Sequence, residues 1–461
     1  MNFRDRSLLI GWLTFFFCAP SQALEFPKTE MTRTQAVEHL LNRAAFGPRP
    51  TQIAELTPPK KLEAWLETQL QPASIDDSAV ETKLKSLCST TMTGKQLFEN
   101  YLTTPDATRE QMNSRFIFSE LAVRKIVRAA ESKRELEQVL LDFWFNHFSV
   151  DRNFPHYLPL YEREAIAPHL FGRFEDMLTA VAKHPAMLYY LDNWRSAKVG
   201  ATLAEDLRTK IEWAYPPPGG RNDNYAREIL ELHTVGPDAG YTEKDIEGVS
   251  RVFTGWTISK EKSDPGFVFV PTWHDETDVV IMGRRYSGKK GADEGLALIH
   301  DLAMHPKTVE TIAKKLCLRF VQDPPPAACV KRMTKSYLAG KGDLTALYRE
   351  LFTSTEFWNP KGRRTRFKGP FEFVASSLRA LGSDVVLDGS FIPGINLMMA
   401  KSGHQPYACR VPNGYYESDA AWSNAASTLW RSLVAPKLVE IARTKTTVTA
   451  MDLVSPEFQR R

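Results

Sequence analysis

The sequence predicts a mainly α-helical protein, built as one large multi-helical domain with a small β-hairpin insertion at about residues 264–290. Most segments repeat apolar residues at spacings of three and four, which is typical of amphipathic helices. Only one region changes to short runs of β-branched and aromatic residues, which favour strands. With 43% hydrophobic and 25% charged residues among 461, the composition is that of an ordinary globular protein.

The first segment, "MNFRDRSLLIGWLTFFFCAPSQA", has the features of a secretory signal peptide. Arg4 and Arg6 precede an apolar run over residues 8–18, and small residues lead to Ala23. A membrane anchor would need about 18 or more apolar residues, and this run is shorter. We therefore expect a signal peptide over residues 1–23 and an exported, periplasmic or extracellular protein over residues 24–461.

The helices that follow are predicted from their apolar spacing and their end signals. "TRTQAVEHLLNRAAFGPRP" predicts a helix over residues 34–45 that is ended by Gly47 and Pro48. "TPPKKLEAWLETQLQP" predicts a second helix, and residues 109–150 predict two long ones. Residues 73–108 are mixed and polar, so we expect a long excursion there.

Three further helix starts are predicted from local caps. His184 and His305 each precede a proline, which is tolerated in the first turn of a helix, so each pair marks a helix restart. We interpret both histidines as cap or surface residues. Thr242 with Asp245 three residues later forms a loose capping box.

The expected β-hairpin comes from two short runs, "GFVFVP" and "DVVIMG". They flank a polar turn that contains His274 and Asp275. From about residue 291 the helical pattern returns, and it ends in a last helix at about 425–443.

Four cysteines remain after the signal peptide: Cys88, Cys317, Cys329 and Cys409. An even number in an oxidising compartment favours one or two disulfides. Cys317 and Cys329 flank a proline-rich turn, so we expect this pair first.

Charge and motifs argue against several functional classes. The formal net charge is +4, and no run of five basic residues occurs, so nucleic acid is not an expected partner. The sequence also has no G-x-S-x-G elbow, no H-E-x-x-H helix and no P-loop.

The run "NDNYAREILELHTVG" gathers polar residues on one predicted helix. On an ideal helix Asn224, Arg227, Glu228 and Glu231 share about a third of the circle, and His233 lies on the opposite, apolar side. In one interpretation the polar face is solvated and Arg227 pairs with its acidic neighbours. In the other, this face lines a cleft, where Arg227 and Asn224 orient Glu228 and Glu231 as acid or base.

Two inward-pointing histidines suggest a metal site. His147 ends an apolar stripe on the helix "LEQVLLDFWFNHFSV", and His233 has the same character. If their faces meet, His274 and Asp275 could add a nitrogen and an oxygen, which zinc, iron or manganese accept as ligands. The alternative is that each histidine is a hydrogen-bonded core residue.

Two aromatic stretches could line a cleft that suits sugars. They are Gly255-Trp256 and Gly414-Tyr415-Tyr416, and core packing explains them equally well.

Several ordered segments resemble a family of exported bacterial proteins, the domain-of-unknown-function 1800 family. They are "HLLNRAAFGP", "DFWFNHFSV", "HPAMLYYLDN", "NDNYAREILELHTVG", "GYTEKDIEGVSRVFTGWT", "WHD", "HPKTVETIAKKLCLRFVQDPPP" and "FKGPFEFVASSLRALG". The resemblance implies a helical, exported protein without an assigned reaction, and a partnership with a secreted sulfatase- or phosphatase-like protein. "SGHQPYACRVPNGY" departs from the family's glycine-glutamine-proline block.

Three functional hypotheses follow. The first is an exported enzyme, metal-dependent and hydrolytic, that acts on a cell-envelope or extracellular polymer; its divalent metal is held by His147, His233, His274 and Asp275. The second is a non-catalytic binding or assembly factor that works with the sulfatase-like partner. The third is an enzyme with non-covalent haem, although no haem-attachment motif occurs.

Overall fold

The computed structural model describes residues 24–97, 99–100, 107–151, 157–201, 220–259, 266–382, 384, 387, 391–442 and 446–461. The predicted signal peptide over residues 1–23 lies outside this range. The fold is mainly α-helical, as predicted, with two small antiparallel sheets. None of the helices within these ranges is long and apolar enough to cross a membrane.

The helices are distributed along the whole described chain. The first group comprises α1 (Arg33–Ala44), α2 (Gln52–Leu56), α3 (Lys61–Gln69), α4 (Ser78–Leu84), α5 (Gly94–Leu97), α6 (Ala107–Glu131), α7 (Glu135–His147) and α8 (Leu158–Leu160). The second comprises α9 (Phe174–Lys183), α10 (Pro185–Tyr190), α11 (Asp223–Glu228), α12 (Glu243–Val252), α13 (Ala292–Met304), α14 (Pro306–Phe320), α15 (Ala327–Ala339) and α16 (Leu344–Phe352). The third comprises α17 (Pro370–Ala380), α18 (Phe391–Ala400), α19 (Asp419–Trp422), α20 (Ala425–Ala442) and α21 (Ala450–Leu453).

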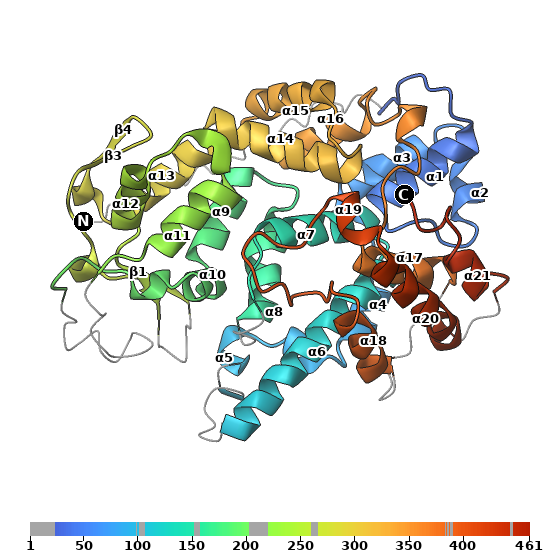
Figure 1. The fold of residues 1–461 in the computed structure, drawn as a ribbon, viewed down its shortest axis with the longest axis horizontal. Helices are drawn as coiled ribbons and strands as arrows, with labels where there is room; N and C mark the ends of the chain where they lie inside the picture. The colour runs from blue at the N-terminus through green and yellow to red at the C-terminus, as the bar shows by residue number, and fades with distance from the viewer. Residues whose placement is uncertain are drawn as a thin grey trace, which may run out of the picture.

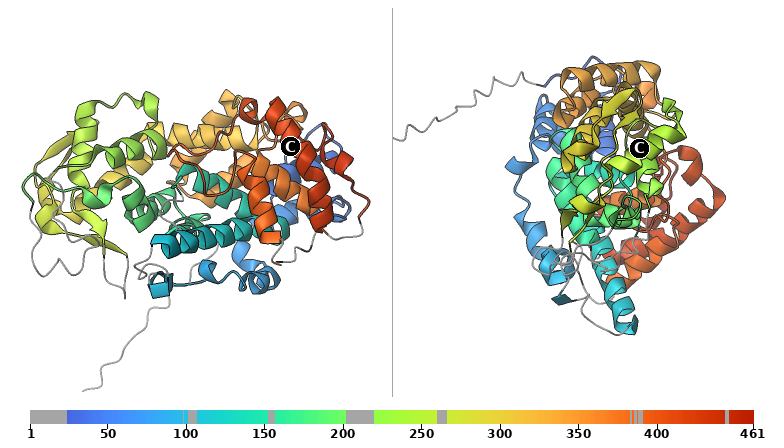
Figure 2. Two further views of the ribbon diagram at one scale, coloured as in Figure 1. Left: turned by 60° about the horizontal axis from the view of Figure 1, so that its bottom comes forward. Right: turned by 90° about the vertical axis from the view of Figure 1, so that its left-hand side faces the viewer.

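These helices form an elongated molecule with two ends (Figure 1). Helices α9 to α13 and both sheets occupy one end, and the left view of Figure 2 shows the same separation from the blue, orange and red segments. Helix α7 lies near the centre, with α14 above it in the view of Figure 1. The middle of the molecule is therefore built from α7 and α14.

The predicted helix starts are confirmed at the level of individual hydrogen bonds. His184 accepts a hydrogen bond from the Ala186 amide, and His305 accepts one from the Lys307 amide. Thr242 forms its capping box with Asp245. These caps satisfy amides that the first helical turn leaves without an intrahelical partner.

The predicted pairing of the two β runs in one hairpin is wrong in detail. Strand β2 (Phe267–Phe269) pairs with β1 (Trp256–Ile258), and β3 (Val279–Ile281) pairs with β4 (Arg284–Tyr286). Met282 and Gly283, with φ of 46° and 83°, turn the chain directly between β3 and β4. Two consecutive positive φ values are typical of tight hairpin turns, so "DVVIMG" turns back on itself instead of reaching "GFVFVP".

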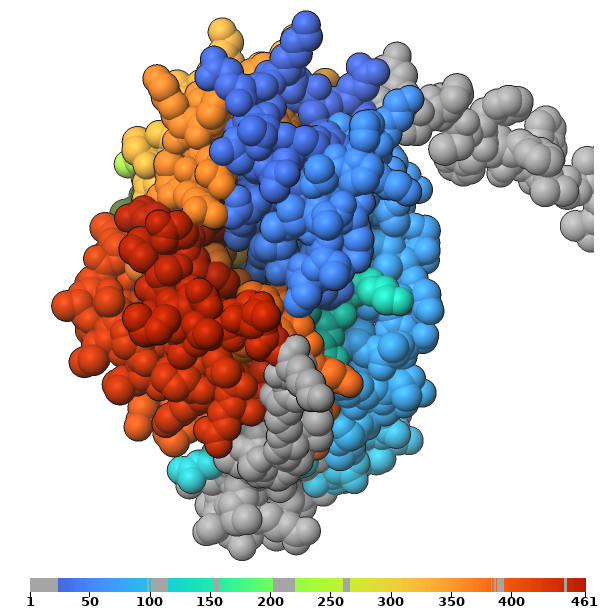
Figure 3. Space-filling view, turned by 90° about the vertical axis from the view of Figure 1, so that its right-hand side faces the viewer, coloured from blue at the N-terminus to red at the C-terminus, as the bar shows by residue number. Residues whose placement is uncertain are grey.

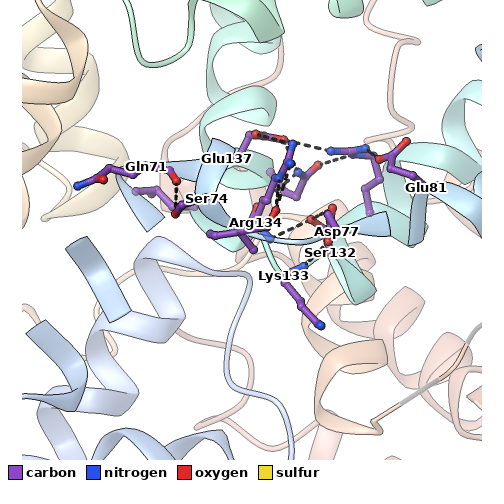
Figure 4. Close-up of polar contacts among 12 residues, drawn as sticks. Gln71, Ser74, Asp77, Glu81, Ser132, Lys133, Arg134 and Glu137 are labelled. Carbon is purple, nitrogen blue, oxygen red and sulfur yellow. Dashed lines mark hydrogen bonds and ion pairs between the residues drawn. The ribbon is translucent and has the colours of Figure 1, made fainter. Parts of the chain in front are cut away.

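Helix α7 is buried on most of its surface, and its start is fixed by a polar network (Figure 4). Asp77 accepts hydrogen bonds from the Ser132 hydroxyl at 2.7 Å and from the Lys133 amide at 2.8 Å. Arg134 donates to the Ile75 carbonyl at 3.1 Å. These contacts tie the chain between α6 and α7 to the segment before α4, and so set the position of α7.

The first and last segments of the described chain adjoin on one face of the molecule, where the blue and red surfaces meet in Figure 3. The Thr29 hydroxyl donates to the Trp358 carbonyl at 2.8 Å, and Phe367 forms an antiparallel bridge with Arg460. The core thus joins N-terminal and C-terminal segments.

The expected disulfide between Cys317 and Cys329 is confirmed, with their Cα atoms 6.2 Å apart. It connects α14 to the start of α15. Cys88 and Cys409 are free, the first exposed and the second buried.

Candidate functional site

A cavity of about 30 Å³ lies between α7, α14, α17 and the loop over residues 401–418, which crosses α7 in Figure 1. We call it the charge pocket, because ionisable side chains from several distant segments line it. Its lining residues are Lys125, Asp142, Phe145, Asn146, Ser149, Arg319, Arg366, Phe367, Gly369, Phe371, Glu372, His404, Pro406, Tyr407, Cys409, Tyr415, Tyr416, Glu417, Trp422 and Arg461.

Arg319 is the centre of the charge pocket. Its guanidinium is 4% exposed and forms ion pairs with Asp142 at 3.2 Å, Glu372 at 3.0 Å and Glu417 at 3.1 Å. Burial opposes a charged carboxylate, but Arg319 and Arg461 outweigh it and lower the pKa of Glu372 to about 2. The same carboxylates outweigh burial at Arg319 and raise its pKa. Arg319 and Arg461 together therefore keep Glu372 ionised although it is buried.

A second cation, Lys125, closes one side of the pocket. Its ammonium lies 3.3 Å from Asp142 and 3.6 Å from Glu162, and it sits 5.0 Å from the centre of the Tyr407 ring. The Tyr407 hydroxyl donates to Glu162 at 2.8 Å. Asp142 is thus held between two cations, Lys125 and Arg319.

His404 contributes an imidazole to this set of charges. Its ring lies 4.2 Å from that of Tyr415 and stacks on Trp422 at 5.2 Å, between ring centres. Its Nδ1 is buried and has no hydrogen-bond partner among the described residues. Burial lowers the pKa of His404 to about 4, against the opposing charges of Asp142 and Glu372. The imidazole is neutral at pH 7.

The loop that carries His404 is attached to α7 through Asn146. The Asn146 side chain donates to the Tyr415 carbonyl at 2.9 Å and accepts from the Tyr415 amide at 2.7 Å. Gly414 adopts φ +71°, and a Cβ there would lie 2.3 Å from the Asn146 carbonyl oxygen. Only glycine allows this close approach of the loop to α7.

The two aromatic stretches have different positions. Tyr415 and Tyr416 line the charge pocket, and Tyr416 is 69% exposed at its mouth. Trp256 is fully buried in the core. One stretch therefore lines a cavity, and the other packs the interior.

The single predicted helix at 224–235 is wrong in its geometry. Helix α11 ends at Glu228 and continues as a π-helix over Ile229–His233. The wider turn breaks the regular 100° step on which the predicted polar face depended. His233 is nevertheless buried, as predicted.

The four acid/base candidates lie at different depths. Asn224 is exposed, and Arg227 forms an ion pair with Glu243 at 3.0 Å. Glu228 is half-buried, and burial together with Glu231 raises its pKa. The Tyr241 hydroxyl donates to Glu231 at 3.2 Å. Arg227 is thus paired to a residue of α12, not to the carboxylates on its own helix.

The structure brings His147 and His233 together, with ring centres 6.4 Å apart. His147 Nε2 lies 3.2 Å from the His233 carbonyl oxygen, which only accepts, so Nε2 carries the proton. Lys315 therefore donates to the Nδ1 lone pair of His147 at 2.9 Å, and it also donates to the Leu232 carbonyl at 3.2 Å. His233 Nε2 has no partner among the described residues.

The ionisation of this cluster follows from its burial. Burial and the Lys315 charge keep the pKa of His147 well below its ordinary value, so the imidazole is neutral. Burial also lowers the pKa of Lys315 to about 8, although Glu417 opposes the shift.

His274 and Asp275 belong to a different set of contacts, beside α12 and α13. His274 Nε2 lies 3.3 Å from Glu294, and its Nδ1 lies 3.0 Å from the Thr254 carbonyl. Asp275 pairs with Arg251 at 2.6 Å. In the ranges that the structure describes, no group of three or more His, Cys, Asp or Glu side chains could hold a metal ion. Metal binding by the four candidates stays a prediction.

Electrostatic contacts connect the predicted candidates to the charge pocket. The Glu417 charge acts on both Lys315 and Arg319, which are one turn apart on α14. Besides burial, the charges of Asp151, Cys409 and Glu228 raise the pKa of Tyr190, and Cys409 lines the pocket. The charges of Glu228 and Cys409 therefore both act on Tyr190.

Sequence reasoning missed the main charged residues of the pocket. Glu372 lies between Phe371 and Phe373, whereas Arg319 lies on an amphipathic helix that carries several other charged residues. A single charge within an apolar segment is rarely buried unless it is paired. That rule could have singled out Glu372, but not Arg319 or the partners of either residue.

Comparison with known proteins gives one result. A family model described as "Protein of unknown function (DUF1800)" matches residues 39–460. No curated protein and no solved structure matches the chain.

Proposed function

Because the chain belongs to the DUF1800 family of unknown function along nearly its whole length, we propose its function from the geometry of the charge pocket. We propose that the protein is an exported enzyme that hydrolyses a polymer of the cell envelope or of the extracellular space. The reaction takes place at the mouth of the charge pocket.

The observation that carries this proposal is the unpartnered Nδ1 of His404 beside the carboxyl groups of Asp142, Glu372 and Glu417. A neutral imidazole with a free lone pair can accept a proton from water. Asp142 and Glu417 then stabilise the imidazolium that forms. His404 is the proposed general base.

Two arginines could stabilise the negative charge that develops during the reaction, as the carboxylates stabilise the positive imidazolium. Arg366 and Arg461 line the pocket, and their Nε groups have no acceptor among the described residues. N–H groups fixed in a buried cavity, away from bulk water, stabilise negative charge that develops on a reacting oxygen.

The small volume of the pocket favours a substrate that binds at its mouth and not inside it. About 30 Å³ is enough for one or two water molecules and too little for a sugar ring. The attacking water therefore lies inside, and the substrate lies across the exposed ring of Tyr416. Aromatic side chains commonly line sites for such ligands.

The predicted metal is a separate component of the hypothesis. His147 and His233 are its closest pair of ligand candidates, and Lys315 already occupies the lone pair of His147. Elemental analysis of the purified protein and of His147→Ala tests it: stoichiometric metal that is lost in the variant supports it, and metal-free wild type contradicts it.

The hydrolytic activity is tested in ¹⁸O-labelled water with isolated envelope and extracellular polymers. We expect the wild type to release soluble fragments and to incorporate one ¹⁸O atom for each bond cleaved, on one of the two new ends. Glu417→Gln should lose activity by about 100-fold or more, because the Glu417 carboxylate stabilises the imidazolium that forms at His404. Glu350→Gln, at an exposed ion pair with Arg332, is the matched control and should keep full activity.

The alternative is a binding or assembly factor that works with a secreted sulfatase- or phosphatase-like partner. It is favoured if the wild type retains polymer without releasing fragments. Full activity in Glu417→Gln would contradict the pocket as reaction centre.

A further inference from the structure

A second, smaller cavity of about 10 Å³ lies behind the charge pocket, between α1, α7 and α17. Arg43, Lys368, Glu372 and Arg461 line it together with four other residues: Asn42, Phe46, Val139 and Ser376. A volume of this size corresponds to one water molecule or one monoatomic ion.

The three cations at this cavity are almost completely buried. Arg43 is 1% exposed, Lys368 is 3% exposed and Arg461 is 4% exposed. A buried charge is costly unless another charge pairs with it, so the partners of each cation decide the chemistry of the cavity.

Arg43 has only neutral partners. It donates to the Phe320 carbonyl at 3.2 Å and to the Gly362 carbonyl at 2.9 Å, and its Nε has no partner among the described residues. No carboxylate pairs with it within these ranges.

In the described part of the chain, the ammonium of Lys368 lies against an aromatic ring and not against a carboxylate. The ammonium lies 3.8 Å from the centre of the Phe458 ring, and among the described residues no carboxylate forms an ion pair with it. Burial lowers the pKa of Lys368 to about 7; Glu372 opposes this shift, and Arg431, Arg461 and Arg364 reinforce it.

Glu372 is the carboxylate that faces the cavity, and it is already engaged. It accepts from Arg319 at 3.0 Å, from Arg461 at 3.1 Å and from the Gly369 amide at 2.9 Å. Three cations therefore share the cavity with one carboxylate, which also serves the charge pocket. Other charges act from further away: Arg366 and Asp419 on Arg43, and Arg431 on Lys368.

We propose that this cavity binds a single halide ion, chloride under ordinary conditions, held by Lys368, Arg43 and Arg461. The cavity volume selects a monoatomic ligand, and the excess of buried positive charge selects an anion. Because Glu372 links the cavity to Arg319, the bound ion also fixes the carboxylate that organises the charge pocket. The site does not depend on the proposed hydrolytic activity.

The test measures thermal unfolding of the full chain at constant ionic strength while chloride or bromide replaces gluconate, which is too large for the cavity. We expect a saturable rise in Tm on the order of 2 °C with either halide. Lys368→Met should abolish the rise, and Lys335→Met, at an exposed position of α15, should keep it.

A bromide-containing crystal of the wild type gives an independent readout that needs no variant. An anomalous peak between Lys368 and Arg461 supports the site. A Tm that is the same in chloride and gluconate, or a cavity that contains only water in that crystal, overturns it.

Discussion

Arg319 is the residue on which the charge pocket most depends, because one guanidinium compensates Asp142, Glu372 and Glu417. None of these partners is close to Arg319 in the sequence, and each comes from a different segment. Removing the cation would leave carboxylates close together in a dry cavity.

We therefore expect Arg319→Met to destabilise the protein by about 3–5 kcal/mol. The free energy of unfolding in urea measures the effect. Arg332→Met is the matched control: Arg332 pairs with Glu350 and Glu356 at the surface, and its loss should cost at most about 1 kcal/mol. Equal losses for both variants would show that Arg319 is not the organising charge.

The lowered pKa of His404 leads to a prediction about the pH dependence of activity. The general base acts in its neutral form, and burial lowers the pKa of His404 to about 4. kcat/KM should therefore rise with pH through about 4 and level off above it, because the neutral fraction increases with pH. An acid limb that instead lies near pH 6.5, the ordinary pKa of histidine, would contradict a buried His404 as the base.

Individual residues also show what the sequence could and could not predict. The caps at Thr242, His184 and His305 depend on neighbours within three residues, so local patterns identified them. His404 and Glu372 meet only through the tertiary fold, and no local pattern contains that information. The predicted candidates Glu228 and His147 are not among the residues that line the pocket.

At the level of elements, α14 connects the two functional regions that the structure reveals. Lys315 on this helix contacts His147, and Arg319 one turn later organises the charge pocket. The disulfide from Cys317, between them, anchors the helix to α15.

Removal of this disulfide should destabilise the protein by about 2–4 kcal/mol, because the bond closes a short loop in the unfolded chain. The comparison is urea unfolding of the wild type and of a Cys317→Ala, Cys329→Ala double variant. Cys88→Ala, at a free and exposed cysteine, serves as the control and should change little. A double variant as stable as the control would mean that packing alone holds α14 and α15 together.

Two local changes of backbone geometry were predicted least well. The β runs were recognised by composition, but their partners were not, because the positive φ at Met282 and Gly283 decides the pairing. The change from α11 to the π-helix after Glu228 also has no signal in apolar spacing, and it altered the predicted polar face.

At the scale of the whole molecule, the pocket is built from distant parts of the chain. Lys125 and Asp142 come from α6 and α7, whereas Glu417 and Arg461 come from the last fifty residues. The predicted fold class is confirmed, but the pocket exists only when both halves of the sequence are folded together.

The most direct test of the account is kcat/KM of His404→Gln on a polymer that the wild type hydrolyses, with Tm as the control for folding. Gln matches the size of His but cannot exchange the proton, so we expect a loss of about 10²–10⁴-fold at nearly unchanged Tm. A folded His404→Gln protein with wild-type kcat/KM would contradict the charge pocket as the reaction centre.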